Sequence, residues 1–230
     1  MKEFFESSSY FGLVITLVTY AIGCFLKKKF RLAIFNPLLV SILLSIAFVA
    51  FFGIDIGKYN ESTDILSYFL TPATVCLAVP LYEQFQKLRD NWLAVVGGIL
   101  AGTLAHLTMI FVCAFAFKIG HTEYVSLLPK SITTAIGIAL SEQHGGIVGI
   151  TVGGICVAGI TGNTFCELIL RVFRITEPVA KGVAIGTASH ALGTSKAIEI
   201  GEVEGAMSGL SIAVCGLLTV VLASFFVRLI

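Results

Sequence analysis

Three polar residues, Glu142, Gln143 and His144, interrupt an apolar part of the chain and are followed by two glycines. An ionisable side chain at membrane depth costs at least about 2.5 to 3.5 kcal/mol for Asp, Lys or Arg, so its presence indicates a functional site. Glu142 and His144 can both take up and release a proton, and we predict that they couple a proton to the chemistry of the site. The alternative is an ordinary exposed loop, in which these side chains lie in water.

A second polar run, GTASHALGTSK, extends from Gly186 to Lys196. Lys196 could supply the cation for a carboxylate, and His190 could exchange a proton near neutral pH. The alternatives for Lys196 are a snorkelling side chain at the membrane interface and a partnership with Glu199, three residues later. The residues of this run that we predict to bind substrate are Thr187, Ser189, Thr194 and Lys196.

Hydroxyl groups also follow Pro129, at Ser131, Thr133 and Thr134. They lie within about one turn of a helix start, where free N–H groups and the positive end of the helix dipole can hold an anion. The alternative is that each hydroxyl bonds to its own backbone. Asn163, in a separate apolar run, completes the predicted substrate-binding set.

The two polar runs belong to an internal repeat. The pattern P-x5-AIG-x-A begins at Pro129 and again at Pro178, 49 residues later, and a histidine follows each copy. A helix with glycine at every fourth residue comes next, at positions 145, 149 and 153 in one copy and 201, 205 and 209 in the other. Such a stripe lets another helix pack closely in lipid.

The composition of the chain and the lengths of its apolar runs indicate the fold class. The chain is 57% hydrophobic and 13% charged, against about 25% charged in a soluble domain. We expect an all-α polytopic membrane protein, a single domain over residues 1–230, with about six full transmembrane helices and two interrupted or re-entrant segments, Ile132 to Leu140 and Val179 to Leu192. The six spans are Tyr10 to Leu26, Leu32 to Phe52, Ile65 to Leu81, Trp92 to Phe117, Ile147 to Leu170 and Val203 to Val227. Four spans lie within residues 1–128, and residues 129–230 hold the interrupted segments and both striped helices.

Basic residues in alternate loops predict the orientation. They are Lys27, Lys28, Lys29 and Arg31, then Lys87 and Arg89, then Arg171 and Arg174. We therefore expect these loops to be cytoplasmic and the N-terminus to lie outside. The first repeat copy then begins outside and the second at the cytoplasmic face, which predicts an inverted repeat whose interrupted segments meet near the midplane. Breaks after Leu140 and Ala191 must line protein or a cavity, because unpaired backbone cannot face lipid.

Other chemistry is disfavoured. All six cysteines lie in apolar runs without C-x-x-C spacing, so we predict no metal site and no cofactor. The chain has neither H-E-x-x-H nor G-x-S-x-G, which argues against an enzyme. A net charge of +1 argues against a nucleic-acid partner. His106, within Trp92 to Phe117, is predicted to make an interhelical hydrogen bond.

The chain resembles the LrgB (CidB/LrgB) family of bacterial membrane proteins. The resemblance rests on Pro129 to Gly146, on TGN at Thr161 to Asn163, on EPVAKGVAIGTASHALGTSKA followed by EVEGAMS, and on PLYEQFQKLRDNW from Pro80. Family members usually carry a second proline and an acidic residue where this chain has Ala135 and Ala139. The resemblance implies the bacterial inner membrane and a small LrgA/CidA-type membrane protein as partner, in a homo- or hetero-oligomer.

Two functions follow from the residues and the resemblance together. The first is a carrier of small monocarboxylates, of the glycolate, glycerate, lactate or pyruvate type, that works by proton-coupled alternating access. The alternative is a holin-like or antiholin-like regulator of murein hydrolase activity and lysis. We favour the carrier, because paired interrupted segments with hydroxyls, histidines and a lysine exceed what a simple pore requires.

Overall fold

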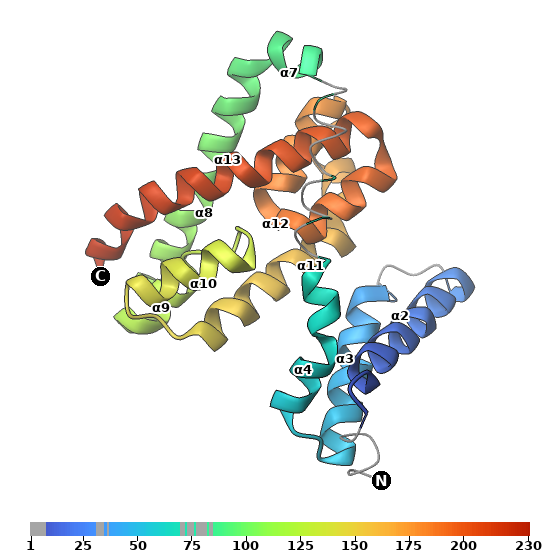
Figure 1. The fold of residues 1–230 in the computed structure, drawn as a ribbon. Coiled ribbons are helices and arrows are strands. Elements are labelled where there is room, and N and C mark those ends of the chain that lie inside the picture. Colours follow the sequence, from blue (N-terminus) through green and yellow to red (C-terminus); the bar gives the residue numbers. More distant parts are fainter. Residues whose placement is uncertain are drawn as a thin grey trace. The chain divides into compact units, whose positions relative to one another are not determined.

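The computed structural model describes residues 8–30, 35, 37–69, 72, 76, 82 and 85–230. Every regular element in these residues is a helix (Figure 1). The chain forms two compact units, Met1–Cys76 and Leu77–Ile230. Within the described ranges, four helices are long and apolar enough to cross a membrane, which confirms a helical polytopic membrane protein. They are α2 (Phe11–Phe30), α8 (Trp92–Phe117), α11 (Val148–Val172) and α13 (Glu202–Phe226), the last continued by η2 (Val227–Leu229).

The predicted spans agree with these helices where both can be compared. The predicted span Trp92 to Phe117 coincides with α8, and those beginning at Ile147 and Val203 start within one residue of α11 and α13. The second span appears as the shorter apolar helix α3 (Pro37–Phe52). The third begins inside α4 (Ile56–Tyr68), and most of its remainder lies outside the described residues.

The first unit contains α2, α3 and α4, joined by hydroxyl contacts. The Thr16 hydroxyl lies 2.7 Å from the Tyr59 hydroxyl on α4, and the Thr19 hydroxyl lies 3.0 Å from the Ser41 hydroxyl on α3. The backbone N–H of Gly12 donates to Ser62 Oγ at 3.1 Å. These bonds join α2 to both of its neighbours through hydroxyl and backbone groups on the facing sides of the helices.

We call the two ends of the second unit the Asn91 end and the Phe117 end, after the residue that precedes α8 and the residue at which α8 finishes. The short helix α7 (Phe85–Asp90) and Asn91 precede α8 at the Asn91 end, and α8 finishes at the Phe117 end. α13 runs in the same direction as α8, because Thr103 contacts Cys215 and, farther along both helices, Tyr124 contacts Phe111 and Phe226. α11 runs the opposite way and starts at the Phe117 end, where the Thr151 hydroxyl in its first turn donates to the carbonyl of Ser126 at 2.9 Å.

A first hairpin enters from the Phe117 end. It consists of α9 (His121–Leu127), a turn at residues 128–133 and α10 (Thr134–Gln143). The Tyr124 hydroxyl donates to the carbonyl of Phe226 at 2.9 Å, which fixes α9 beside the last turn of α13. Lys130, in the turn, lines a cavity together with His106 of α8. His106 lies 11 residues before Phe117, or about 16 Å along the helix, so the hairpin tip reaches the middle of α8.

A second hairpin enters from the Asn91 end and is formed by α12 (Pro178–Ile200) alone. At His190 the backbone leaves helical geometry, with φ 42° and ψ −141°, and the chain reverses. Val183 and Thr187 lie against Gly98 and Gly102, so residues 178–189 run parallel to α8. Residues 191–200 return to the Asn91 end, and α13 follows. The predicted interruption near Ala191 is therefore present, one residue earlier.

The repeat is inverted, but in a different register from the predicted one. Each copy is a hairpin followed by a 25-residue helix: α9, α10 and α11 in one copy, and α12 and α13 in the other. α10 therefore corresponds to residues 191–200, in agreement with the glycine stripes, which lie 56 residues apart. The proline pattern instead pairs α10 with residues 178–189, and this pairing is wrong. α10 and residues 178–189 run in the same direction, so the proline pattern does not mark equivalent positions.

Candidate functional site

A cavity of about 850 Å³ lies between α8 and the first half of α12. The tip of the first hairpin contributes Lys130 and Ser131 to it, and the facing helices contribute His106 and Thr187. The wall is otherwise mostly apolar or small, and Asn91 lies at its far end. Gly102 permits this arrangement, because a Cβ there would lie 2.7 Å from Cγ2 of Thr187.

A second cavity, of about 750 Å³, lies on the other side of α12, against α11. Lys130 lines this cavity also, and Ser189 of the second hairpin faces it near Gly162. Ala184 and Ala188 of α12 are shared by both cavities. Residues at or beside the tips of both hairpins, Lys130 and Ser189, therefore line the same cavity, and Ala184 and Ala188 separate it from the first one.

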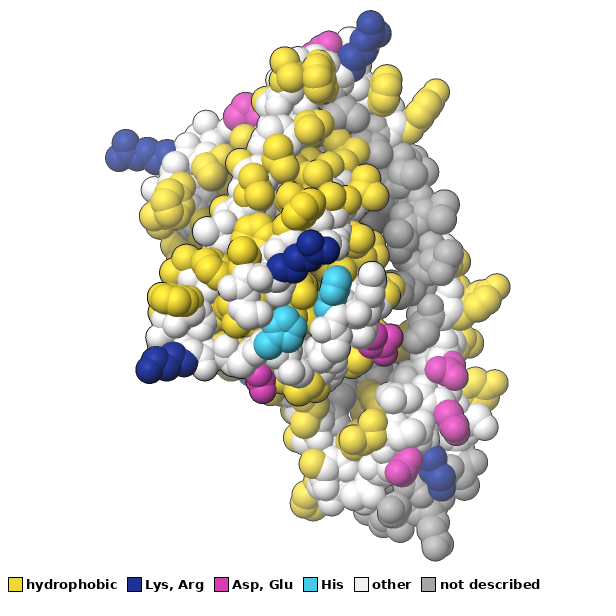
Figure 2. All heavy atoms as spheres, turned by 90° about the vertical axis from the view of Figure 1, so that its left-hand side faces the viewer, with side chains coloured by type: hydrophobic (Ala, Val, Ile, Leu, Met, Phe, Trp, Pro, Cys, Tyr) yellow, Lys and Arg dark blue, Asp and Glu magenta, His cyan; other side chains and the backbone are white. Residues whose placement is uncertain are grey.

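The polar groups of the first cavity have few partners. Lys130 Nζ donates to the Ser131 hydroxyl at 3.3 Å. Within the described part of the chain, no carboxylate lies at ion-pair distance from Lys130. There too, Oγ1 of Thr187 and both ring nitrogens of His106 are buried without a hydrogen-bond partner. Figure 2 shows basic and histidine side chains among hydrophobic ones on one face of the molecule.

His190, which we predict to couple protons, lies at the break of α12 and is held there by hydrogen bonds. Its Nε2–H donates to the carbonyl of Ile155 on α11 at 3.0 Å, and the side chain is buried. The Thr194 hydroxyl donates to the carbonyl of His190 at 3.0 Å and lies 2.7 Å from the Ser208 hydroxyl. The first bond ties the break to α11, and the second gives the carbonyl of His190, at the break itself, a donor.

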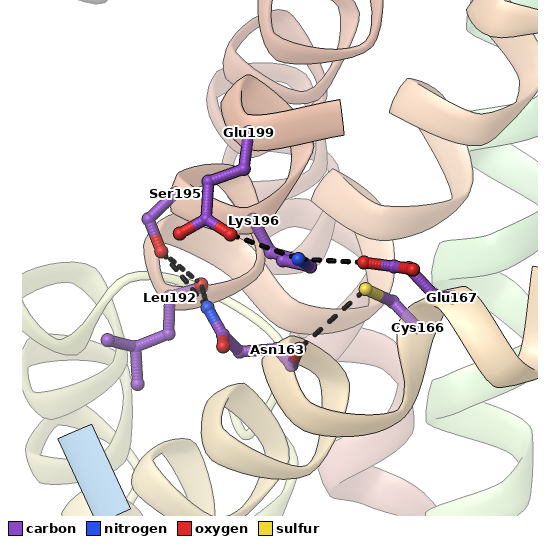
Figure 3. A network of polar contacts seen from close by, with 7 residues as sticks. All are labelled: Asn163, Cys166, Glu167, Leu192, Ser195, Lys196 and Glu199. Atoms are coloured by element: carbon purple, nitrogen blue, oxygen red, sulfur yellow. Dashed lines mark hydrogen bonds and ion pairs between the residues drawn. The ribbon is translucent and has the colours of Figure 1, made fainter. Parts of the chain in front are cut away.

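Lys196 and Asn163 belong to a polar network between α11 and the returning half of α12 (Figure 3). Lys196 Nζ lies 2.7 Å from Glu167 and 2.9 Å from Glu199, so the alternative of a partnership with Glu199 is present. Asn163 Nδ2 donates to the carbonyl of Leu192 at 2.6 Å and to Ser195 Oγ at 3.0 Å. Two carboxylates therefore already balance the charge of Lys196.

Replacing Asn163 with alanine should lower the free energy of unfolding by about 0.5 to 1.5 kcal/mol, because the Leu192 carbonyl beside the break loses one of its two side-chain donors and keeps only the Ser195 hydroxyl, at 2.8 Å. Thermal unfolding in detergent measures the effect. Lys196→Met serves as the comparison and should cost less than about 1 kcal/mol, since Glu167 and Glu199 are more than half exposed. Equal losses for the two variants would contradict this assignment.

The remaining predicted residues lie away from the first cavity. Glu142 is exposed at the end of α10, and His144 is half-buried in the turn before α11. Thr133 is the N-cap residue of α10, without a side-chain capping bond, and Thr134 is exposed. The hairpin explains these positions, because its tip is at Lys130 and its polar run Glu142 to His144 returns toward the start of α11.

Two residues of the cavity were not in the predicted set. Lys130 precedes the predicted hydroxyls and had no predicted role, and the expected interhelical hydrogen bond of His106 is wrong, because both ring nitrogens lack a partner in the described chain. A lysine without a neighbouring acid in an apolar stretch was the available signal. Among the described residues, no three His, Cys, Asp or Glu side chains could together hold a metal ion.

Comparisons with known proteins cover nearly the whole chain. A model described as the LrgB-like family matches residues 16–229. The Antiholin-like protein LrgB of Bacillus subtilis (strain 168) is 38% identical over 224 residues, which is 97% of each chain. The protein of the same name from Bacillus cereus (strain B4264) is 38% identical over 218 residues, which is 94% of this chain and 95% of the relative. No solved structure matches the chain.

Proposed function

This chain belongs to the LrgB-like family, and from that premise we propose that it is an antiholin-like membrane protein that restrains murein hydrolase activity and cell lysis. The observation that carries the proposal is similarity over 97% of both chains to a protein named antiholin-like. Because the match covers 97% of the relative, the part of that protein that resembles this chain is nearly the whole protein to which the name refers.

The proposed partner is a small LrgA/CidA-type membrane protein in the bacterial inner membrane, with the N-terminus of this chain outside. Gly149 and Gly153 of α11 support assembly, because no atom of the described residues lies within 4 Å of a Cβ at either position. A glycine face of this kind admits another helix at close range. The described basic residues Arg89 and Arg171 lie at the same end of the second unit, as the proposed orientation requires.

Deletion and complementation test the antiholin function. Cells that lack this chain should release more murein hydrolase activity and lyse earlier, and a plasmid copy should reverse both effects. Zymography of culture supernatants and turbidity measure them. Unchanged lysis after deletion would contradict the proposal.

A second function is favoured by a separate observation, the meeting of the two hairpin tips at the cavities beside Lys130. We propose that the chain also carries a small monocarboxylate, of the glycolate, lactate or pyruvate type, by alternating access around these tips. Uptake of labelled acid into proteoliposomes, with and without the small partner, tests it. Absence of uptake for every acid would leave only the antiholin function.

A further inference from the structure

The turn of the first hairpin carries a cation that no acid among the described residues compensates. Lys130 is half-buried, and its one hydrogen bond in the described chain goes to Ser131, itself buried. Partly removing an ammonium group from water is costly unless an opposite charge compensates it. Lys196, in contrast, contacts two carboxylates. The uncompensated charge therefore lies at the meeting point of the hairpins.

Two further groups that line the cavity with Lys130 also lack partners in the part of the chain that the structure describes. Thr187 is 5% exposed and lines the same cavity, and its Oγ1 makes no hydrogen bond within the described residues. The same holds for both ring nitrogens of His106. Buried polar groups in folded proteins are nearly always paired, so unpaired ones that face a cavity indicate a ligand.

The dipole of α10 adds to the positive charge of Lys130. α10 begins at Thr134, directly after the turn, and its N-cap residue Thr133 makes no side-chain capping bond. The positive end of this helix therefore lies a few residues from Lys130. The nearest acid of the cavity wall is Glu177, which caps α12 and lies ten residues, or about 15 Å, before Thr187 along the helix.

We propose that the cavity between α8 and α12 binds the carboxylate of a small monocarboxylic acid against Lys130, with donors from Ser131, Thr187 and His106. One uncompensated cation matches one negative charge. A carboxylate has two oxygens that accept several hydrogen bonds, and Ala184 and Ala188 leave room for a short carbon body. This inference rests on the carrier function proposed above and identifies its substrate site.

Binding to the purified full chain in neutral detergent tests the site, with lactate and uncharged lactamide as probes in titration calorimetry. Lactate should bind, and lactamide should bind at least tenfold more weakly, because it lacks the charge. Lys130→Ala should weaken lactate binding at least tenfold, whereas Lys130→Arg should retain it within about threefold. The matched control is Lys118→Asn, which removes an exposed lysine at φ 53°, a conformation that asparagine tolerates.

Thr187→Val provides a second readout that misfolding cannot mimic. It should weaken lactate binding about threefold to tenfold and at the same time raise the melting temperature of the empty protein, because it removes an unpaired buried hydroxyl. A variant that is merely damaged would lose both binding and stability.

The outcomes separate this site from the carrier function. Lactate binding that depends on Lys130 supports the site even if proteoliposomes show no uptake, in which case the carrier proposal fails. Uptake that Lys130→Ala leaves unchanged overturns the site and leaves the carrier. Absence of lactate binding to the parent protein, or equal binding of lactamide, also overturns the site.

Discussion

Gly186→Ala should destabilise the second unit by about 1 to 3 kcal/mol or more, the largest loss that we expect from adding one methyl group. Gly186 lies where α12 crosses α13, and a Cβ there would lie 2.8 Å from Cα and 2.9 Å from the carbonyl carbon of Ser208. These are backbone atoms, so no side chain can rotate away and the two helices must separate. Separation would also disturb Thr194, whose hydroxyl contacts that of Ser208.

The matched control is Gly153→Ala in the interior of α11, where none of the residues that the structure describes comes within 4 Å of the added methyl group. Alanine favours the helix over glycine by about 0.8 to 1 kcal/mol, so this variant should be neutral or slightly more stable. Thermal unfolding of both variants in the same detergent measures the difference. If the two variants unfold at the same temperature, the close crossing of α12 and α13 is wrong.

The spans could be predicted from the sequence because length and apolar composition determine them. α8 coincides with its prediction, since lipid requires about 20 apolar residues whatever the tertiary structure. The interruption at His190 was also predictable, because a polar run in an apolar segment must find protein or water. Its partners on α11 were not, because the Ile155 carbonyl is 35 residues away.

The register of the repeat could not be predicted, because two patterns gave two offsets. The proline pattern repeats after 49 residues and the glycine stripe after 56. The hairpins follow the stripe, since the 25-residue helices that come after them begin 54 residues apart, at Val148 and Glu202, which is closer to the offset of the stripe. Proline begins a helix equally well in either half of a hairpin, so it does not identify the half.

The hardest feature of the site to predict from the sequence was which of the two lysines, Lys130 or Lys196, lacks an acidic partner. Lys196 is followed by Glu199, yet its closer partner is Glu167, 29 residues earlier on another helix. Lys130 has no such acid in the described chain, and the absence of a partner depends on every segment that packs around it. Sequence patterns report what neighbours are present within a helix, whereas an unpaired charge is a property of the whole fold.

Lys130→Met should therefore raise the stability of the empty protein while it lowers lactate uptake at least tenfold. The methionine removes a half-buried, uncompensated charge, which should gain about 1 kcal/mol or more, and its unbranched side chain fills a similar space. Uptake falls because the anion loses its charged partner. Thermal unfolding and proteoliposome uptake of labelled lactate measure the two effects.

Lys196→Met is the matched control for that result. It removes two ion pairs and leaves two carboxylates together, so stability should fall slightly, by less than about 1 kcal/mol, and uptake should change less than twofold. The same substitution thus has opposite effects on stability at the two lysines. If Lys196→Met abolishes uptake and Lys130→Met does not, the substrate carboxylate binds at the returning half of α12 and the cavity beside α8 has another purpose.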